Sequence, residues 1–408
     1  MPKQWQWIVT QIGSREHYGV PRGFERIGQL KLLYTDVWRR GLMGLMRHGN
    51  ATMRAFAGRY HPDIPPSKVV SFNSRAIVHA VAARRQRSVD ETYHQYLRVG
   101  DEFDRSVVRD LKRRRDIDTV RDAFFGYNTG SLHSIRFCRE LGLPTVLNQI
   151  DPAKTEEDIV AAEAEKWPGW EKIPGRIPQA YWNHMKSEWT AADLVLVNSE
   201  WSRQALIQQG VAAEKLRVVP LTFESERKIE PAAPSPKAGP LTVLWLGTVC
   251  LRKGIQYLIE AAKILGPGDF KFIVAGHSLI SAEAIASAPP SMSFIGRVTR
   301  DNTSQYYRQA DIFVLPTISD GFAITQVEAM AHGLPVITTP NCGQVVTDGM
   351  NGLIVPAGDA RALAGALETL NGNRRLLVEM SHQALKRSAD FAIPSQVLSV
   401  EKAMNEIK

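Results

Sequence analysis

Two carboxylates stand eight positions apart, with an apolar helix start between them, in the segment SDGFAITQVEAMAHGLPVI (319–337). Asp320 lies just before the predicted helix, which we expect to begin near Ile324 and to end at Gly333. Glu328 lies one turn inside the helix, about 5–6 Å further along its axis. A single ligand that spans both acids would fit this spacing.

The backbone at the start of this helix also suits an anion. The segment DIFVLPT (311–317) has the pattern of a strand and ISDGF that of a loop, so the helix N-terminus lies beyond the carboxyl end of a strand. The first N–H groups of a helix have no partner within it and lie at its positive end. We therefore expect a phosphate to contact the residues of this turn, which are Gly321, Phe322, Ala323, Ile324 and Thr325.

A basic pair follows another predicted strand in the same half of the chain. In LTVLWLGTVCLRKGI the strand ends at Gly247, and Lys253 opens the next helix after a short loop. A lysine there can neutralise a diphosphate, and the guanidinium of Arg252 can add a bidentate contact. Taken alone, the pair is interpreted equally well as an exposed basic turn.

Short β-branched runs alternate with helical segments along the chain, which is the pattern of parallel sheets covered on both faces. We predict an α/β protein of two doubly wound, Rossmann-like domains, residues 1–223 and 241–390, joined by the Pro- and Ala-rich linker 224–240. The predicted strands are 7–13, 68–73, 123–128, 145–150, 194–199 and 216–221 in the first domain, and 241–247, 270–276, 292–298, 311–317, PVITTP and GLIVPAG in the second.

The composition is that of a globular protein with room for two cores. The chain has 408 residues, of which 44% are hydrophobic and 23% charged. Its three cysteines form no CxxC pair, which argues against a zinc site and against a disulfide framework. No apolar run is long enough to span a membrane, and MPKQWQWIVTQIG lacks the apolar core of a signal peptide. We therefore expect a cytoplasmic protein.

The net charge of +8 lies entirely in the first half of the chain. Residues 1–220 hold 33 Lys and Arg against 25 Asp and Glu, whereas residues 221–408 hold 17 of each. Residues 38–61 mix arginines with Leu, Met and Phe, which suits an anionic membrane surface and, somewhat better, an ordinary amphipathic helix that covers a sheet. The run RDLKRRRD (109–116) is typical of a solvated helix face. Neither run has the interleaved aromatics of a nucleic-acid site, so no nucleic acid is expected as a partner.

Together these motifs resemble glycosyltransferase family 4, nucleotide-sugar enzymes with the two-domain GT-B fold. The likeness is carried by LGTVCLRKG, by FIGRV (294–298) and by the run from DIFVLPT to GLIVP, and it covers the second domain almost completely. The acids match the family's E-x7-E motif, with Asp320 in place of the first glutamate. A weaker likeness extends back through TAADLVLVNSEWSRQALIQQGV in the first domain.

The resemblance implies a role for each matching position in the second domain. Glu328 would hold the ribose hydroxyls of the nucleotide, and Asp320 would contact hydroxyls of the donor sugar. Lys253, helped by Arg252, would stabilise the leaving diphosphate. Three residues, Gly296, Arg297 and Val298, would lie beside the base.

The resemblance also places an active site in the cleft between the domains. The loop GSREHYGVPRG would be the family's glycine-rich loop, which approaches donor and acceptor, and the residues expected to face the cleft are Gly13, Ser14, Arg15, His17 and Asp151. Residues 391–408 would form the GT-B C-terminal helix that crosses back to the first domain. Family members are typically retaining and need no metal, so no cofactor is expected besides the donor substrate.

Some positions depart from the family pattern. Thr248 and Gln344 stand where many relatives have an arginine and a glutamate. Gln149 and Asp151 occupy a region where relatives commonly place a histidine. Asp116 and Asp118 form a DxD, the metal signature of the other glycosyltransferase fold, but they lie among alternating charges away from any predicted strand end.

We therefore expect a retaining, metal-independent glycosyltransferase of the hexosyltransferase class. It would move a sugar from a nucleoside-diphosphate sugar to a saccharide or lipid-linked acceptor in cell-surface polysaccharide or glycoconjugate synthesis, at the inner face of the membrane if its basic half binds lipid. A nucleotide-sugar epimerase and a non-catalytic sugar-binding relative are the alternatives. Four aromatic residues, Trp167, Trp170, Tyr181 and Trp182, are compatible both with a sugar-stacking surface and with the cover of a sheet edge.

Overall fold

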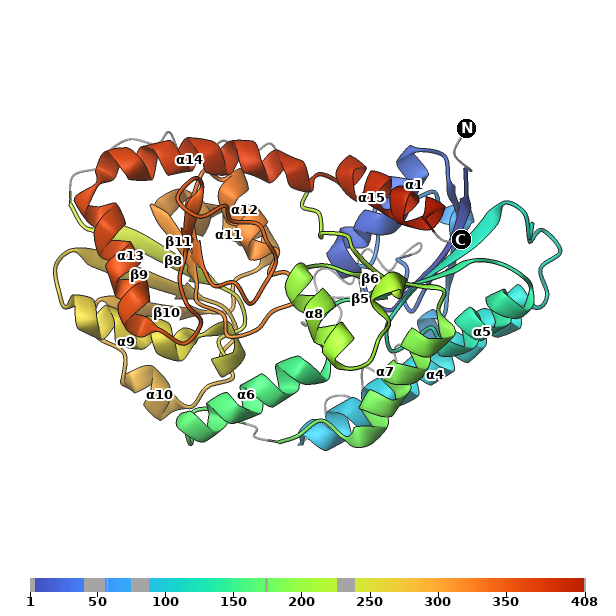
Figure 1. Ribbon diagram of the computed structural model, residues 1–408, viewed down its shortest axis with the longest axis horizontal. Coiled ribbons are helices and arrows are strands. Elements are labelled where there is room, and N and C mark those ends of the chain that lie inside the picture. The colour runs from blue at the N-terminus through green and yellow to red at the C-terminus, as the bar shows by residue number, and fades with distance from the viewer. Residues whose placement is uncertain are drawn as a thin grey trace.

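The computed structural model describes residues 4–39, 56, 58–74, 88–172, 175–225 and 239–406. Each half of the chain builds its own parallel sheet, with strand order β3-β2-β1-β4-β5-β6-β7 in the first half and β10-β9-β8-β11-β12-β13 in the second. The two halves form two lobes that lie side by side (Figure 1). The predicted pair of doubly wound α/β domains is thus confirmed.

The first sheet contains one strand that the sequence pattern did not predict. Its strands are β1 (Gln6–Gln11), β2 (Leu30–Thr35), β3 (Val69–Ser71), β4 (Asp122–Tyr127), β5 (Thr145–Gln149), β6 (Leu194–Val197) and β7 (Leu216–Val218). The unpredicted strand β2 carries a lysine in its apolar run. The ammonium of Lys31 lies 2.5 Å from the buried carboxylate of Asp122, which compensates the charge beside the sheet.

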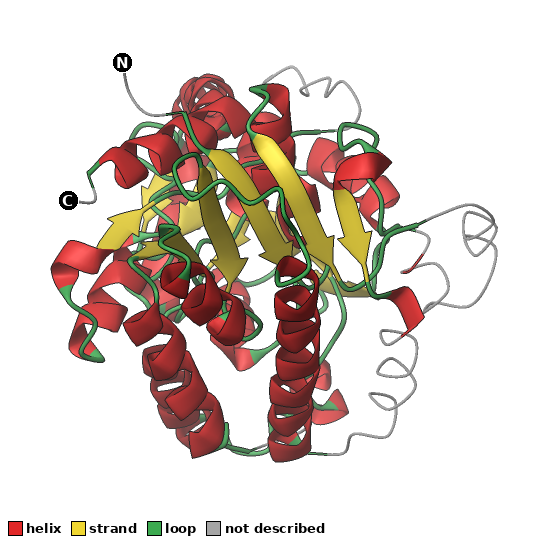
Figure 2. Cartoon of the chain, turned by 90° about the vertical axis from the view of Figure 1, so that its right-hand side faces the viewer, coloured by secondary structure: helices red, strands yellow, loops and turns green. Residues whose placement is uncertain are grey.

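Helices lie on both sides of this sheet (Figure 2). They are α1 (Gly19–Arg26), α4 (Val89–Leu111), α5 (Leu132–Glu140), α6 (Lys154–Lys166), α7 (Gln179–Ala191) and α8 (Glu200–Gln208). The longest, α4, begins at a Ser88 cap whose side chain accepts a hydrogen bond from the Glu91 N–H. Its last turn and the residues after it form the basic run 109–116, where most side chains are exposed, as predicted for a solvated face.

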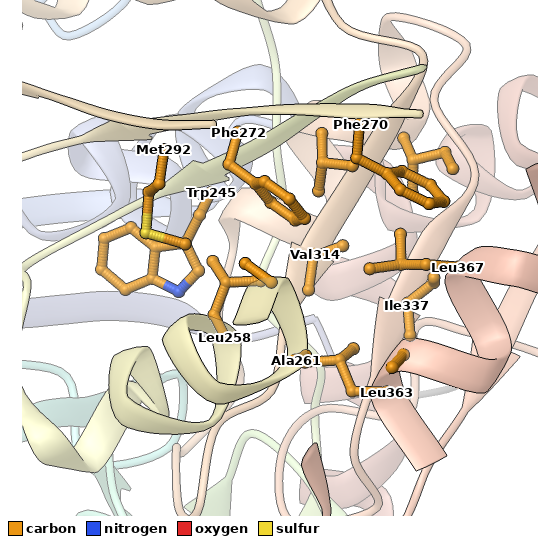
Figure 3. Close-up of a cluster of buried hydrophobic side chains, with 14 of the residues drawn as sticks. Trp245, Leu258, Ala261, Phe270, Phe272, Met292, Val314, Ile337, Leu363 and Leu367 are labelled. Atoms are coloured by element: carbon orange, nitrogen blue, oxygen red, sulfur yellow. The ribbon is translucent and has the colours of Figure 1, made fainter. Parts of the chain in front are cut away.

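The second sheet follows the predicted order of strands closely. It is built from β8 (Leu241–Leu246), β9 (Phe270–Ala275), β10 (Met292–Gly296), β11 (Ile312–Leu315), β12 (Val336–Thr338) and β13 (Gly352–Ile354). The helices α9 (Ile255–Leu265), α10 (Ala282–Ala286), α11 (Arg300–Gln309), α12 (Thr325–Ala331), α13 (Ala360–Gly372) and α14 (Arg374–Ser388) surround it. Leu258 of α9 and Leu367 of α13 pack with Trp245 and Phe272 of the sheet into one buried core (Figure 3).

The last helix, α15 (Ile393–Asn405), leaves the second domain and packs on the first (Figure 1). Val397 and Val400 of α15 share a buried cluster with Trp7 and Phe24 of the first domain. An ion pair also ties the start of the linker to the first domain. Arg26 of α1 lies 2.7 Å from Glu224, the first residue of the predicted linker. Residues 226–238 of that linker lie outside the described residues.

Helix α6 is a second bridge between the domains. It follows β5 of the first domain but contacts the start of α9 in the second, where Gln256 donates a hydrogen bond of 3.3 Å to Glu163. The chain after α6 continues the contact, since Glu171 accepts from the Leu251 N–H at 3.0 Å and the Lys172 N–H donates to the Leu279 carbonyl at 2.9 Å. Residues of the first domain are thereby held beside the basic turn of the second.

The membrane hypothesis depends on a segment that is largely missing from the described ranges. Of residues 38–61, positions 40–55 and 57 lie outside the described residues. None of the described helices is both long enough and apolar enough to cross a bilayer.

Candidate active site

The basic turn is held against the neighbouring strand by a glycine. The short 3₁₀ turn Leu251–Lys253 follows β8, and Gly254 ends it with φ of +74°. A Cβ at Gly254 would lie 1.7 Å from the carbonyl oxygen of Pro316, just after β11, so only glycine allows this approach. The turn is further tied to that strand by the Arg252 carbonyl, which accepts hydrogen bonds from the Thr317 hydroxyl and the Ile318 N–H.

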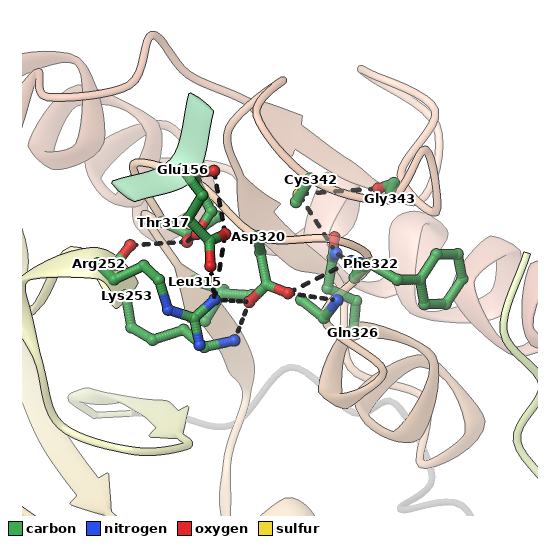
Figure 4. Close-up of polar contacts among 12 residues, drawn as sticks. Glu156, Arg252, Lys253, Leu315, Thr317, Asp320, Phe322, Gln326, Cys342 and Gly343 are labelled. Carbon is green, nitrogen blue, oxygen red and sulfur yellow. Dashed lines mark hydrogen bonds and ion pairs between the residues drawn. The ribbon is translucent and has the colours of Figure 1, made fainter. Parts of the chain in front are cut away.

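Lys253 and Arg252 meet Asp320 beyond the carboxyl ends of β8 and β11 (Figure 4). The Lys253 ammonium forms a close ion pair with the Asp320 carboxylate, and Nη1 of Arg252 lies 3.6 Å from the same oxygen. Burial, and then the neighbouring guanidinium of Arg252, lower the pKa of Lys253 to about 7. Three residues predicted to act together are therefore in contact, at the edge of the sheet where parallel α/β proteins bind ligands.

The second carboxylate oxygen of Asp320 caps the loop before α12. It accepts hydrogen bonds from the N–H groups of Phe322 at 3.3 Å and Ala323 at 3.1 Å. Two of the N–H groups that the sequence assigned to a phosphate are therefore already paired in this structure, because the short Asp320 side chain folds back onto its own loop. Ala323 adopts a left-handed conformation, with φ of +60°. At Gly321 a Cβ would lie 2.2 Å from the Ile150 carbonyl of the first domain, so the loop touches the opposite wall of the cleft.

Glu328 lies in α12 and lines a cavity of about 330 Å³ between the domains. The Tyr307 hydroxyl donates to its carboxylate at 2.8 Å. The Tyr307 ring in turn stacks on the His332 ring, with centroids 4.7 Å apart. Ser14 and His17 of the first domain line the same cavity, so the cleft brings together residues more than 300 positions apart.

The three residues assigned to the base lie at the edge of the second sheet. Gly296 ends the edge strand β10 with φ of +72°, and its carbonyl accepts from the Gly276 N–H at 2.9 Å. Arg297 is exposed, and Val298 packs against the cluster that contains Phe322 and Val327. These residues are thus beside the α12 region but are not in the contact network of Lys253 and Asp320.

The loop after β1 has an unusual backbone. Gly13 has φ of +88° and its N–H donates to Asp36 at 2.9 Å, and the three consecutive residues Glu16, His17 and Tyr18 all have positive φ. Burial raises the pKa of Glu16, whose carboxylate accepts from Gln396 of α15 at 3.0 Å. The Arg15 guanidinium lies over the Tyr127 ring at 5.6 Å.

Backbone strain gathers at the edges of the cleft. Six non-glycine residues in the described ranges have positive φ: Glu16, His17, Tyr18, Thr129, Ala153 and Ala323. Each lies in a loop that follows the carboxyl end of a strand, namely β1, β4, β5 or β11. Such conformations cost about 1–3 kcal/mol each and persist where the surrounding structure enforces them, commonly at functional sites.

Asp151 and Glu156 line the first-domain side of the cleft. Asp151 accepts hydrogen bonds from Gln149 at 2.8 Å and from the Ala153 N–H at 3.0 Å, and burial raises the pKa of its carboxyl. Glu156, in the first turn of α6, lies 3.4 Å from Arg252 and accepts from the Ser319 hydroxyl at 3.1 Å (Figure 4). The sequence analysis missed Glu156, because an acidic first turn is common in helices and gives no sign of a distant partner.

The predicted aromatic group divides in the structure. Tyr181 lines a large cavity of the first domain, whereas Trp182 is buried and donates to Glu157 at 2.8 Å. Trp167 and Trp170 pack on each other with centroids 4.8 Å apart, next to the second domain. Among the residues that the structure describes, no three His, Cys, Asp or Glu side chains gather closely enough to hold a metal ion.

Comparison with known proteins assigns the domain that carries this site. Residues 240–373 match the model of the family described as glycosyl transferases group 1. The second domain belongs to this family. A relative of this group 1 domain is the amylovoran biosynthesis glycosyltransferase AmsK of Erwinia amylovora, 30% identical over 197 residues, or 44% of this chain and 47% of the relative. Another is the lipopolysaccharide core biosynthesis mannosyltransferase LpsB of Rhizobium meliloti, 32% identical over 171 residues, or 38% of this chain and 48% of the relative.

The chain thus spans about half the length of the curated relatives it matches. Solved structures align over nearly all of it. HepE of Anabaena, in complex with UDP and glucose, covers 99% of both chains with a TM-score of 0.62 and 15% identity. The sucrose-phosphate synthase of Thermosynechococcus elongatus also covers 99% of both chains, with a TM-score of 0.64 and 17% identity. The group 1 domain therefore sits in a chain with the GT-B fold.

Proposed function

We propose that this protein is a retaining glycosyltransferase that moves a sugar from a nucleoside-diphosphate sugar to a saccharide or lipid-linked acceptor. The observation that carries the proposal is the meeting of Lys253, Arg252 and Asp320 at the strand ends of a group 1 domain. The two cations are partly buried, share the Asp320 carboxylate and lie beside the strand ends, so a diphosphate bound here would contact both of them in place of their present carboxylate partners.

Each group in this site has a task in the proposed reaction. The bond between the anomeric carbon and the diphosphate oxygen breaks, its electron pair leaves with the nucleoside diphosphate, and the acceptor hydroxyl forms the new bond and releases its proton to the departing phosphate. Negative charge therefore builds on the diphosphate, where Lys253 and Arg252 stabilise it. Asp320 would release Lys253 and then bind hydroxyls of the donor sugar. Glu328 would bind the ribose.

The relatives indicate where to begin with substrates. Three are named for amylovoran, capsular polysaccharide or lipopolysaccharide core biosynthesis, and HepE was solved with UDP and glucose. We therefore propose a role in cell-surface polysaccharide or glycoconjugate synthesis, with a hexose donor, and would test UDP-hexoses first. The basic first domain would hold the acceptor.

The experiment is release of nucleoside diphosphate from a panel of nucleotide sugars, with and without a membrane extract as a source of acceptors. Extract-dependent release supports the proposal. Conversion of the donor sugar to its epimer without release would identify an epimerase instead, and donor binding without either reaction would identify a non-catalytic relative.

A pair of lysine variants makes the test specific to the site. Lys253→Ala should lower turnover by about a hundredfold or more, since it removes a cation that acts on the leaving group. Lys263→Ala, in the exposed part of α9 where Lys263 pairs with Glu260 at 2.8 Å, is the matched control and should behave as the wild type. Equal loss in both variants would argue against the assignment of Lys253.

Two further parts of the proposal have their own tests. We propose that turnover needs no metal or other cofactor, so it should survive an excess of EDTA. We also propose that the protein is cytoplasmic and contacts the inner face of the membrane. Sedimentation with anionic vesicles that weakens in high salt would support this contact, and absence of sedimentation at low salt would refute it.

A further inference from the structure

The first domain contains a cavity of about 630 Å³ that is separate from the Lys253 site. It opens beyond the carboxyl ends of β1, β4 and β5, and side chains of α4 and α7 close one side. Four tyrosines line it, Tyr93, Tyr96, Tyr127 and Tyr181, and we refer to it as the tyrosine cavity. Its volume is in the range of small-molecule sites, and Arg15 and Asp151 connect its wall to the cleft.

Polar atoms on the floor of the tyrosine cavity have no hydrogen-bond partner. Within the described part of the chain these include Oε1 of Gln11, Oδ1 of Asn128 and Nε of Arg15. The Gln11 and Asn128 side chains are only 1% and 4% exposed. A buried polar atom without a partner costs about 1–3 kcal/mol. The two amide oxygens accept hydrogen bonds, so the group that completes them must bring donors such as hydroxyls.

The wall of the cavity is aromatic. Tyr93 packs edge-on against Tyr181, with ring centroids 4.8 Å apart, and against Tyr96 at 5.4 Å. Tyr96 is 51% exposed, so its ring stands at the mouth, where a ligand can cover it. Aromatic rings present an apolar face, and the C–H face of a pyranose is a suitable partner for such a face.

The floor is also held in a strained conformation. Thr129, which lines the cavity, is β-branched and has φ of +80°. Its N–H donates to Glu188 at 2.7 Å, and its hydroxyl lies 3.2 Å from the Tyr181 hydroxyl. Because the Glu188 side chain is fully buried, this bond fixes the loop after β4, and with it the position of Asn128.

Charge in the cavity argues against an anionic ligand. The lining includes the carboxylates Asp36, Glu102 and Asp151 beside the guanidinium groups of Arg15 and Arg59. With three carboxyl groups beside two guanidinium groups, the described lining offers a phosphate or uronate no excess of positive charge. A prenyl or acyl chain would cover the tyrosines but leave the Gln11 and Asn128 oxygens unsatisfied.

We propose that the tyrosine cavity binds the neutral pyranose ring of the acceptor, with its C–H face on Tyr96 and Tyr93 and its hydroxyls donating to Gln11 and Asn128. The inference rests on the proposed glycosyltransferase function and adds to it the class of acceptor. The accepting sugar is an uncharged hexopyranose. Any lipid or phosphate of the acceptor lies outside the cavity, beyond Tyr96.

Direct binding tests the inference without requiring turnover. The probes are p-nitrophenyl glycosides of neutral hexoses, a p-nitrophenyl glucuronide and dodecyl phosphate, and the measurement is saturation transfer from protein to ligand protons by NMR. We expect at least one neutral glycoside to bind through its ring protons. Preferential binding of the glucuronide or of dodecyl phosphate, or no binding of any neutral glycoside, would overturn the proposal.

Two variants locate the bound ring. Tyr96→Ala, at an exposed position with little risk to folding, should weaken binding of the neutral glycoside about tenfold, and Asn128→Ala should weaken it about as much. Leu141→Ala, at a 39% exposed position outside the cavity lining, is the control. Unchanged binding in both cavity variants would also overturn the proposal.

A separate readout distinguishes this inference from the proposed function. UDP affinity reports the donor site and should be the same in the wild type and in Tyr96→Ala. If the wild type releases nucleoside diphosphate with an acceptor and Tyr96→Ala does so with an unchanged KM for that acceptor, only the cavity assignment fails. If neutral glycosides bind here but no nucleotide sugar is turned over, the glycosyltransferase proposal fails instead.

Discussion

Arg252 of the second domain and Glu156 of the first form an ion pair across the cleft, with Nη1 of Arg252 3.4 Å from each carboxylate oxygen. Burial lowers the pKa of Arg252, but the surrounding acidic groups, of which Glu156 contributes most, together raise it further, so the net shift is upward. Ser319 donates to Glu156 at 3.1 Å and accepts from Trp201 at 3.1 Å. Polar groups of the two domains therefore alternate along this chain of contacts. Its carboxylate, Glu156, neutralises Arg252, the cation that we assign to the diphosphate.

A donor diphosphate must therefore compete with Glu156 for Arg252. Glu156→Gln keeps the shape of the side chain and an acceptor for Ser319 but removes its charge. We expect UDP to bind about three to ten times more tightly to this variant, which corresponds to about 0.6–1.4 kcal/mol. Isothermal titration calorimetry with UDP measures the change.

The control for this prediction lies on the same helix. Asp158 of α6 is half exposed and pairs with Lys154 and Arg176, away from Arg252. Asp158→Asn therefore removes the same charge without freeing the cation, and its UDP affinity should match the wild type. Weaker binding to Glu156→Gln would mean that Glu156 positions Arg252 for the phosphate and does not compete with it.

The protonation of Lys253 predicts how donor affinity depends on pH. Its pKa in the free protein is lowered to about 7, so the side chain is charged below that pH and loses its proton above it. A diphosphate favours the charged form, and binding above pH 7 must therefore include proton uptake. We expect the Kd for UDP to rise from pH 7 to pH 9, by at most about tenfold per pH unit. Titrations in buffers of different ionisation enthalpy would detect the proton directly.

The variant Lys253→Arg shows whether Lys253 or another titratable group in the cleft causes this pH dependence. Arginine stays charged across the range, so the increase in Kd above pH 7 should disappear in this variant even if its affinity is lower throughout. An unchanged pH profile in Lys253→Arg would assign the titration to another group with a raised pKa, such as Asp151, Glu156 or Cys250.

The predicted site residues that the structure brings into contact share one property. Lys253 and Asp320 each follow a strand within a few positions, and parallel strands bring their carboxyl ends together, so local patterns were enough to bring the two residues into one site. Glu156 was missed because its partner Arg252 is 96 positions away and on the other domain. Tyr93 and Tyr96 were missed for the same reason, since their cavity forms only when α4 packs beside α7.

Two other features differ from the sequence prediction because a charged side chain is paired in a way that the sequence pattern does not reveal. Strand β2 was not predicted because Lys31 interrupts its apolar run, and the position of that lysine is explained by the Asp122 carboxylate at the start of β4 and by the Asp116 carbonyl, which both accept from its ammonium. The N–H groups of Phe322 and Ala323 were assigned to a ligand, but Asp320 pairs with them. In both cases a charged side chain found a partner whose position the fold decides.

The hydrogen bond from Tyr307 to Glu328 allows a graded test of the proposed ribose site. Glu328→Gln removes the charge that would accept two hydroxyls, and we expect the KM for the donor to rise about 10–100-fold with a smaller change in kcat. Tyr307→Phe removes one neutral donor that orients Glu328 and should raise the KM about two- to tenfold. Tyr306→Phe, on the same helix, is the control and should leave the KM unchanged. A larger effect of Tyr307→Phe than of Glu328→Gln would contradict the assignment of Glu328 to the ribose.

The packing of α15 on α1 predicts a specific loss of stability. Gly23 faces α15 so closely that a Cβ there would lie 2.4 Å from Cγ2 of Val397 and 3.0 Å from Cγ2 of Ile393. Gly23→Ala should therefore destabilise the protein by about 1–3 kcal/mol, although alanine is the better helix former. Urea unfolding followed by circular dichroism measures the change in the free energy of unfolding.

A double variant and a control separate overpacking from helix propensity. Val397→Ala opens the space that the new methyl group needs. The loss of stability in the double variant Gly23→Ala, Val397→Ala should therefore be clearly smaller than the sum of the two single-variant losses. Gly365→Ala, inside α13 where a new Cβ would meet no atom within 4 Å, should raise stability by about 0.5–1 kcal/mol. Additive losses in the double variant would show that α15 does not press on Gly23 in solution. The contact that returns the end of the chain to the first domain would then be looser than the structure has it.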